Sequence, residues 1–312
     1  MTPTIPPSPA PHRPTVEPSP VVWSWHYYSS LSLSEQTLQQ QQQQADNTTN
    51  TASNDNTTTN NNNKNKRRRN MLLAQATGVD KGYVRMLDIT SVVNRAYARK
   101  FGYDYVSMEG MVLGGTEPWH STFGKVEVLH QALRMRPRYD GILILDTDAI
   151  MVDFDVDIAD LVEDEYALVA QYVLPGQHQW NLNVGVSLWN LHHPMTAWLS
   201  ERWRNLSLET LQSDTPDDDQ WLLQLTLRDD INETVRNATI STVNRIFDYR
   251  YGTVVKHFIR ITGQWNETLQ DRQTELQEVA QRICQQFQPH CQGIPSRISQ
   301  EEEKEATTTT TS

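Results

Sequence analysis

Short apolar runs alternate with stretches of helical periodicity along the middle of the chain, from residue 71 to about residue 204. Apolar runs of strand length predict strands at 70–76, 103–107, 141–145, 166–171 and 183–189, with two more near 238–243 and 253–259. Helical periodicity predicts helices at 85–101, 122–135, 155–162, 194–204 and 219–227. This alternation predicts an α/β fold, with a mostly parallel mixed sheet flanked by helices in a single domain.

The two ends of the chain lack this pattern. Residues 1–70 are rich in Pro, Ser, Gln, Asn and Thr, with an uninterrupted glutamine run at 39–44. Such a segment cannot bury enough apolar area to offset chain entropy, so we expect it to be disordered. We expect a folded domain at 71–265, a C-terminal helical extension at 266–300, and a disordered acidic and Thr-rich tail at 301–312.

The charge and the cysteines narrow the class of protein. The formal net charge is −11, which argues against nucleic acid as a partner because phosphates require a basic face. A basic cluster at 64–69 is the exception, and it fits either a solvated linker or a nuclear signal. No apolar run reaches the roughly 18–20 residues of a membrane helix, and no signal peptide is visible. Cys284 and Cys291 could close one small disulfide loop in an oxidising compartment.

The strongest chemical signal is a fully apolar strand, 141–145, that ends in Asp146-Thr147-Asp148. Ligands of open α/β sheets bind beyond the carboxyl ends of strands. In extended backbone Asp146 and Asp148 point to the same side, where two carboxylates repel unless a cation or a proton lies between them. Mn²⁺ or Mg²⁺ suits such oxygen ligands and could bridge to a diphosphate. Asp-x-Asp also occurs by chance, and the aspartates at 153–157 fit helix capping better.

Further motifs follow in an order that resembles a known family. The set is similar to nucleotide-sugar glycosyltransferases of the GT-A (Rossmann-like) type, and in particular to the Golgi family of fungal α-galactosyl- and α-mannosyltransferases and plant xyloglucan xylosyltransferases. The resemblance spans roughly 71–263. Its motifs are Asn94, Tyr97-Ala-Arg-Lys-Phe-Gly-Tyr103, Lys125, Tyr139–Asp148, Asn181–Asn190, Asp217–Gln220 and Val254–Phe258.

The resemblance implies a role for each of these positions. Metal ligation of Mn²⁺ (or Mg²⁺) falls to Asp146, Asp148 and His257, against the diphosphate of a UDP- or GDP-sugar. Binding of the donor or substrate falls to Lys125, Thr147, Asn183 and Gly185 together with the two metal-binding aspartates. The catalytic positions are Asp218, Asp219 and Gln220, next to the reacting sugar and the acceptor.

Each position also has a plain structural interpretation. His257 could be a packed strand histidine, Lys125 a solvated helix lysine, and Asn183 with Gly185 a strand-entry turn. Asp218 and Asp219 suit the start of a helix. The family continues its histidine into a Gly-Cys-Lys-Pro-like segment, whereas Ile259-Arg-Ile-Thr-Gly263 follows here. The late phosphate-binding lysine is therefore missing, and Lys256 or Arg260 could substitute.

Taken together, the resemblance implies a metal-dependent glycosyltransferase, a hexosyl- or pentosyltransferase that retains configuration. Its partners would be a nucleotide-sugar donor, a glycan or glycoprotein acceptor, and other glycosyltransferases in a complex. The implied location is the Golgi or another secretory-pathway lumen, membrane-associated in the family, and Asn-x-Ser/Thr acceptor sites at 205, 232, 237 and 266 fit a luminal glycoprotein. Two alternatives stay open. One is a catalytically degenerate glycosyltransferase-fold binding subunit. The other is a haloacid-dehalogenase-like phosphatase, which also places Asp-x-Asp after an apolar strand.

Overall fold

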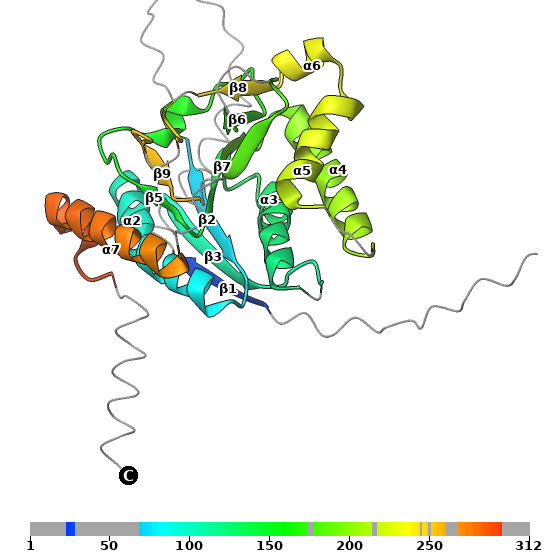
Figure 1. Cartoon of the computed structure of the whole chain (residues 1–312). Helices are drawn as coiled ribbons and strands as arrows, with labels where there is room; N and C mark the ends of the chain where they lie inside the picture. Colours follow the sequence, from blue (N-terminus) through cyan, green and yellow to red (C-terminus); the bar gives the residue numbers. More distant parts are fainter. Residues whose placement is uncertain are drawn as a thin grey trace, which may run out of the picture.

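The computed structural model describes residues 23–28, 69–115, 117–173, 178–213, 217–243, 245–248, 251–259 and 268–294. A seven-stranded sheet lies at the centre, in the order β1-β3-β2-β4-β7-β6-β8, and a two-stranded sheet joins β5 to β9 (Figure 1). The strands are β1 (Trp23–Tyr28), β2 (Met71–Thr77), β3 (Asp104–Gly110), β4 (Gly141–Asp146), β5 (Ala149–Met151), β6 (Leu168–Tyr172), β7 (Leu182–Asn190), β8 (Ile240–Thr242) and β9 (Val255–His257).

The strand directions confirm the predicted fold class. β2 pairs in parallel with β3 and β4, and β6 pairs in parallel with β8. β7 lies antiparallel between β4 and β6, and β1 is antiparallel to β3. Five of the seven strands (β2, β3, β4, β6 and β8) therefore run in one direction, with β1 and β7 opposed to them. The sheet is mixed but mostly parallel in direction, which places the carboxyl ends of β2 and β4 at the same edge.

Helices cover both faces of the sheet, as the alternating pattern predicts (Figure 1). One hydrophobic cluster joins a sheet face to α2 and α7, and a second joins the other face to α3, α4 and α5. The helices and helical turns are α2 (Lys81–Phe101), η1 (Pro118–Phe123), α3 (Gly124–Arg134), η2 (Ile158–Leu161), α4 (Pro194–Thr210), α5 (Asp219–Leu225), η3 (Thr226–Asp230), α6 (Glu233–Asn237), α7 (Leu269–Gln286) and α8 (Gln288–Cys291).

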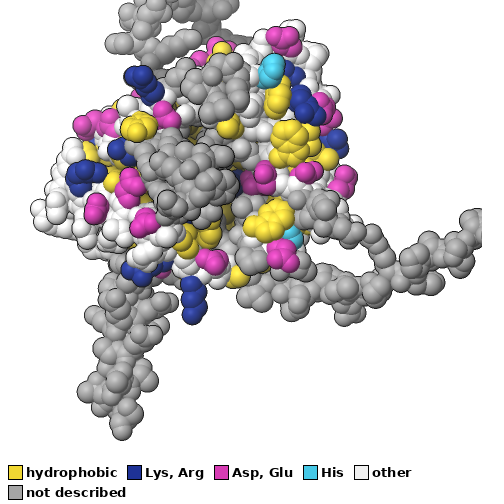
Figure 2. Space-filling view, viewed as in Figure 1, with side chains coloured by type: hydrophobic (Ala, Val, Ile, Leu, Met, Phe, Trp, Pro, Cys, Tyr) yellow, Lys and Arg dark blue, Asp and Glu magenta, His cyan; other side chains and the backbone are white. Residues whose placement is uncertain are grey.

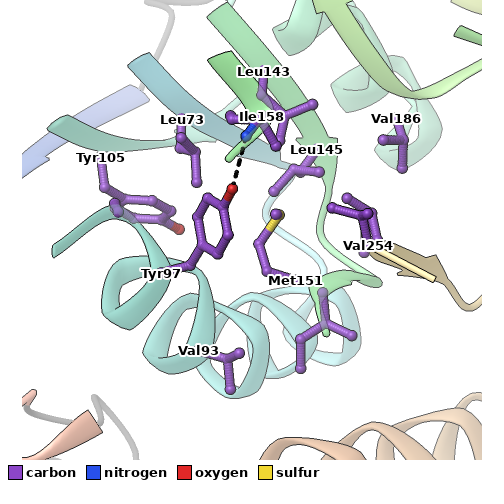
Figure 3. Packing of buried hydrophobic residues seen from close by; sticks show 14 of the residues in the cluster. Leu73, Val93, Tyr97, Tyr105, Leu143, Leu145, Met151, Ile158, Val186 and Val254 are labelled. Carbon is purple, nitrogen blue, oxygen red and sulfur yellow. Dashed lines mark hydrogen bonds between the residues drawn. The ribbon is translucent and has the colours of Figure 1, made fainter. Parts of the chain in front are cut away.

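The packing of α2 shows how its apolar stripe meets the strands. Figure 3 shows Tyr97 of α2 between Leu73 of β2 and Met151 of β5. The Tyr97 hydroxyl accepts a hydrogen bond from the Ile158 backbone N–H at 3.0 Å. Gly102 ends the helix in the left-handed conformation (φ 68°), where glycine has no steric penalty.

Two of the predicted elements differ from the structure, and β5 and α6 were not predicted at all. The helix expected at 155–162 is only the single turn η2, because the backbone is extended at Asp157, which caps the turn at the Ala159 N–H, and again at Val162. The strand β1 lies inside the segment expected to be disordered, so that prediction is wrong for residues 23–28. The average composition of 70 residues does not reveal a strand of six residues within them, and these six residues pair antiparallel with β3. The rest of residues 1–68 and the tail at 301–312 lie outside the described residues.

The C-terminal segment joins the main core. Leu276, Val279 and Ile283 of α7 belong to the same hydrophobic cluster as α2. A disulfide between Cys284 and Cys291 links α7 to α8 and confirms the single loop that the cysteines allowed. Within the described part of the chain, no helix is both long enough and apolar enough to cross a membrane.

Candidate metal centre and adjoining cavity

The Asp-x-Asp turn and His257 come together where β4 ends. β4 stops at Asp146, the chain turns, and β5 begins at Ala149, directly after Asp148. β9 pairs antiparallel with β5 so that His257 lies opposite Ala149. The His257 Nε2 atom is 3.2 Å from Asp148 Oδ1 and 3.5 Å from Asp146 Oδ2. The three side chains each offer one ligand atom within 4.8 Å of the others, as expected for a shared metal ion.

The burial and the hydrogen bonding of the His257 ring fit a metal ligand better than a histidine that only packs in a strand. The side chain is only 2% exposed. Among the described residues its Nε2 atom makes no hydrogen bond, although both carboxylates lie close by. A buried polar atom normally has a partner, and two carboxylates with one imidazole form a suitable oxygen and nitrogen set for a divalent ion. The residues present therefore fit the expected metal.

Lys125 is buried in this cluster rather than solvated on its helix. Its Nζ atom lies 2.6 Å from Asp146 Oδ1 and 3.1 Å from Asp219 Oδ2. Burial by itself would lower the pKa of Lys125, but the two carboxylates raise it above its usual value, so the ammonium stays charged. Burial would likewise raise the pKa of Asp146, yet Lys125 and His257 hold it well below its usual range. Asp146 is therefore a carboxylate, as a metal ligand must be.

The candidate catalytic residues separate in space. Asp219 begins α5 and is buried against Lys125, and burial raises the pKa of its carboxyl group. Asp218 is exposed, and its Oδ1 atom accepts a hydrogen bond from the Trp221 N–H at 2.6 Å, which caps α5. Gln220 accepts a hydrogen bond from the Val184 N–H at 3.2 Å and so joins α5 to β7. Of the three, Asp219 belongs to the charged cluster, and Asp218 has the capping role left open above.

Gly185 explains how β7 passes so close to the metal group. A Cβ atom at this position would overlap the His257 ring and the Asp146 carboxylate. The side-chain Oδ1 atom of Asn183 accepts a hydrogen bond from the Gly185 N–H at 2.9 Å, within the same strand. The pair is not a strand-entry turn, because both residues lie inside β7, and the glycine leaves room for the metal group.

A buried polar network, largely missed by sequence reasoning, holds the Asp-x-Asp turn in place. Gln75 donates a hydrogen bond to the Asp146 carbonyl oxygen at 3.1 Å, and Thr90 donates to the Thr147 carbonyl oxygen at 2.9 Å. Asn94 donates to the Ala149 carbonyl oxygen at 3.1 Å. The available signal was a polar residue inside an apolar pattern: Gln75 in the first strand and Thr90 in the apolar stripe of the first helix.

A cavity of about 630 Å³ opens beside the metal group. It lies at the carboxyl ends of β2 and β4, where ligands of α/β sheets bind, and its volume suits a small organic ligand. Tyr83 and Trp119, each about two-fifths exposed, supply aromatic surface. The lining residues are Ala76, Thr77, Gly78, Asp80, Tyr83, Trp119, Ser121, Thr122, Lys125, Asp146, Thr147, Asp148, Ile259 and Arg272.

Arg272 is a further site residue that the sequence did not indicate. It lies on α7, is 5% exposed, and lines the cavity. Its Nη1 atom lies 3.1 Å from Asp148 Oδ2 and 3.1 Å from the Phe258 carbonyl oxygen. No local motif marks it, because 124 residues separate it from Asp148 along the chain. Of the two cations considered earlier, Lys256 precedes His257 on β9 and so points to the opposite face, and Arg260 lies outside the described residues.

Comparison with known proteins gives similarity at the level of structure. No protein-family model matches the chain, and no curated protein sequence matches it. Among solved structures, a glycosyltransferase involved in the glycosylation of the major capsid of PBCV-1 is 13% identical, with a TM-score of 0.47 over 67% of this chain and 99% of that one. The glycosyltransferase GlyE of Streptococcus pneumoniae TIGR4 is 17% identical, with a TM-score of 0.44 over 73% of this chain and 65% of that one. Mouse xyloside xylosyltransferase 1 is 11% identical, with a TM-score of 0.37 over 64% of this chain and 99% of that one.

Proposed function

We propose that the chain is a metal-dependent glycosyltransferase of the GT-A type that uses a UDP- or GDP-linked sugar. The observation that carries this proposal is the Asp146–Asp148–His257 group beside a cavity of about 630 Å³, which the two aspartates line. A divalent ion held there, Mn²⁺ or Mg²⁺, would neutralise the charge that develops on a leaving diphosphate. Because the chain's likeness to solved structures is weak, the proposal depends on the geometry of this site.

The residues around the metal group have separable tasks in this proposal. Lys125 keeps the Asp146 carboxylate charged and fixes its orientation, since their atoms are 2.6 Å apart. Tyr83 and Trp119 offer aromatic faces against which a nucleobase could stack at the cavity. Thr147 lines the cavity beside the two metal-binding aspartates, where the donor sugar would lie.

The acceptor side of the reaction is assigned to the start of α5. Asp219 and Gln220 are held in place by Lys125 and by β7, while Asp218 is exposed where an acceptor could approach. In this proposal Asp218 or Asp219 stabilises the positive charge that develops on the reacting sugar, or orients the acceptor hydroxyl. Transfer with retention of configuration to a glycan or glycoprotein is the expected outcome.

One covalent bond of the chain supports a luminal enzyme. The Cys284–Cys291 disulfide is favoured in an oxidising compartment, such as the Golgi or another part of the secretory pathway. Figure 2 shows basic and acidic side chains interspersed over the viewed face, without a gathering of basic groups. A glycan or glycoprotein acceptor, and other glycosyltransferases as partners in a complex, fit this location.

Thermal unfolding of the full chain with UDP or GDP, each with and without Mn²⁺, tests the proposal. A ligand that binds only the native state raises the melting temperature, by about 5–10 °C at a hundredfold excess over Kd. We expect the rise to require both the nucleotide and the metal and to vanish in Asp148→Asn. Asp155→Asn makes the same change at an exposed carboxylate and should keep the full rise.

The other possible results point to the alternative functions. No rise with either nucleotide in the folded wild-type protein would contradict a donor site. A rise without any transfer across a broad panel of donors and acceptors would indicate a degenerate binding subunit. Trapping of a covalent phosphate on Asp146 would indicate a phosphatase of the haloacid dehalogenase type.

A further inference from the structure

Arg272 shares one metal-binding carboxylate with the proposed ion. Its Nη1 atom lies 3.1 Å from Asp148 Oδ2, while the Oδ1 atom of the same carboxylate faces His257 at 3.2 Å. The guanidinium therefore supplies a positive charge directly beside the metal group. A second cation beside an ion site is unfavourable unless a further anion also binds there.

The guanidinium also has donors left for such an anion. An arginine side chain carries five N–H groups in a planar fork. Within the part of the chain that the structure describes, the side-chain hydrogen bonds of Arg272 all come from Nη1, and their acceptors are Asp148 and Phe258. The remaining N–H groups, on Nε and Nη2, belong to a side chain that lines the cavity. This is a nearly buried cation with unused donors next to an open space.

The position of Arg272 is set by how α7 docks on the start of α2. Gln273 donates a hydrogen bond to the Gly82 carbonyl oxygen at 2.8 Å, and Leu269 packs so closely that a Cβ atom at Gly82 would overlap it. The Arg272 guanidinium lies 5.8 Å from the centre of the Tyr83 ring, which also lines the cavity. These contacts hold the planar group in place before a ligand arrives, which limits the entropy lost on binding.

We propose that Arg272 is the diphosphate-binding cation of this protein, supplied by the C-terminal helix α7 rather than by the segment that follows His257. The inference rests on the proposed function, and it assigns one binding residue within that site. Arginine matches phosphate oxygens through two parallel N–H···O bonds. A bound metal ion would neutralise the charge of Asp148 and so weaken its pairing with Arg272. The N–H groups of Arg272 could then donate hydrogen bonds to the phosphate oxygens of the ligand. Lys125 has fewer donors to offer, since two of its three N–H groups already face Asp146 and Asp219.

Titration calorimetry on the full chain tests the assignment with three probes: Mn²⁺ alone, Mn²⁺ with UDP or GDP, and Mn²⁺ with inorganic pyrophosphate. In Arg272→Gln we expect the affinity for nucleotide and for pyrophosphate to fall about tenfold to a hundredfold, the usual range for lost charged hydrogen bonds. The affinity for Mn²⁺ alone should be at least that of the wild type, because a competitor for Asp148 has gone. Arg272→Lys should recover part of the loss, and Arg282→Gln, an exposed arginine on the same helix, should bind like the wild type.

The outcomes separate this inference from the proposed function. Unchanged nucleotide and pyrophosphate affinity in Arg272→Gln would overturn the assignment, and so would an equal loss of affinity for Mn²⁺ alone, which indicates a structural role. If Arg272→Gln does not fold, Arg272→Lys provides the test, because lysine lacks the planar guanidinium. An affinity for pyrophosphate in Arg272→Lys equal to that of the wild type would overturn bidentate binding. If the wild-type protein binds pyrophosphate but neither nucleotide, the proposed function fails and the anion site stands. If it binds none of these ligands, both fail.

Discussion

At the scale of single residues, charge pairing explains why a few polar groups are buried together. Lys125 is 5% exposed, and it is tolerated there because two carboxylates surround it. The same carboxylate that pairs with Lys125 also faces His257. Protonation of His257 and binding of a metal ion at these carboxylates therefore affect each other.

This coupling predicts how metal binding depends on pH. Burial alone would lower the pKa of His257, but the Asp148 and Asp146 carboxylates raise it to about 9. At neutral pH the metal-free imidazole is charged, and it must lose its proton before it can bind an ion. We expect the affinity for Mn²⁺ to increase as pH rises toward 9, by up to about tenfold per pH unit, and then to level off.

Calorimetric titration with Mn²⁺ at several pH values between 6.5 and 9.5 measures this dependence. Repeating each titration in buffers of different ionisation enthalpy gives the number of protons released. His257→Gln should bind Mn²⁺ more weakly and with much less pH dependence. An affinity of the wild-type protein that is constant across this range would contradict the protonation of His257.

At the scale of elements, the site is formed where short strands approach each other closely. The two-stranded sheet places His257 opposite Ala149, and β7 passes beside Asp146 at Gly185. The network of Gln75, Thr90 and Asn94 binds the backbone carbonyl oxygens of the turn. Each element is marginal alone, since β5 and β9 have three residues each, so the site depends on their mutual packing.

Substitution of Gly185 tests this close approach. In Gly185→Ala the added Cβ overlaps the His257 ring and the Asp146 carboxylate, so the strands must separate. We expect overpacking to cost about 1–3 kcal/mol of unfolding free energy, and the affinity for Mn²⁺ to fall at least about tenfold. Urea unfolding and metal titration measure the two effects separately.

Gly141→Ala is the matched control for that change. It adds the same methyl group at the other end of β4, where the Cβ meets Met71 and the Trp189 backbone instead of the site. It should lower stability by a similar amount and keep the affinity for Mn²⁺. Equal Mn²⁺ affinities in the wild type and Gly185→Ala would show that β7 does not constrain the metal group.

At the scale of the whole molecule, the C-terminal segment is structurally part of the domain that holds the site. α7 contributes Leu276, Val279 and Ile283 to the core around α2 and carries Arg272 into the cavity. The disulfide closes a short loop between α7 and α8 at the far end of α7 from Arg272. Stability and ligand binding should therefore respond differently when this bond is lost.

Removal of the disulfide makes that difference measurable. The cross-link reduces the conformational entropy of the unfolded chain. For a loop with a sequence separation of 7, this raises the free energy of unfolding by about 2–3 kcal/mol. We expect reduction, or the double change Cys284→Ser and Cys291→Ser, to lower the melting temperature by several degrees. Binding of Mn²⁺ and nucleotide should change by less than about threefold. A large loss of binding in the still-folded protein would show that α8 controls the position of Arg272.

Much of the fold and part of the site follow from local sequence signals. The apolar run at 141–145 predicts a buried central strand, and the carboxylates after it predict a cation site. The helix cap at Gly102 and the single disulfide follow from residue type and spacing. These features depend on backbone geometry and hydrophobic periodicity, which act over a few residues and are therefore visible in the chain itself.

The tertiary structure alone decides which distant groups meet at that strand end. The resemblance proposed His257 as a metal ligand, but the distance to Asp148 depends on the pairing of β5 with β9. The burial of Lys125 depends on Asp219 arriving from α5, and Arg272 reaches the cavity only because α7 docks on α2. Local pattern does not encode these contacts, because they are selected by the packing of whole elements, and the free energy of a buried charge depends on every group that surrounds it.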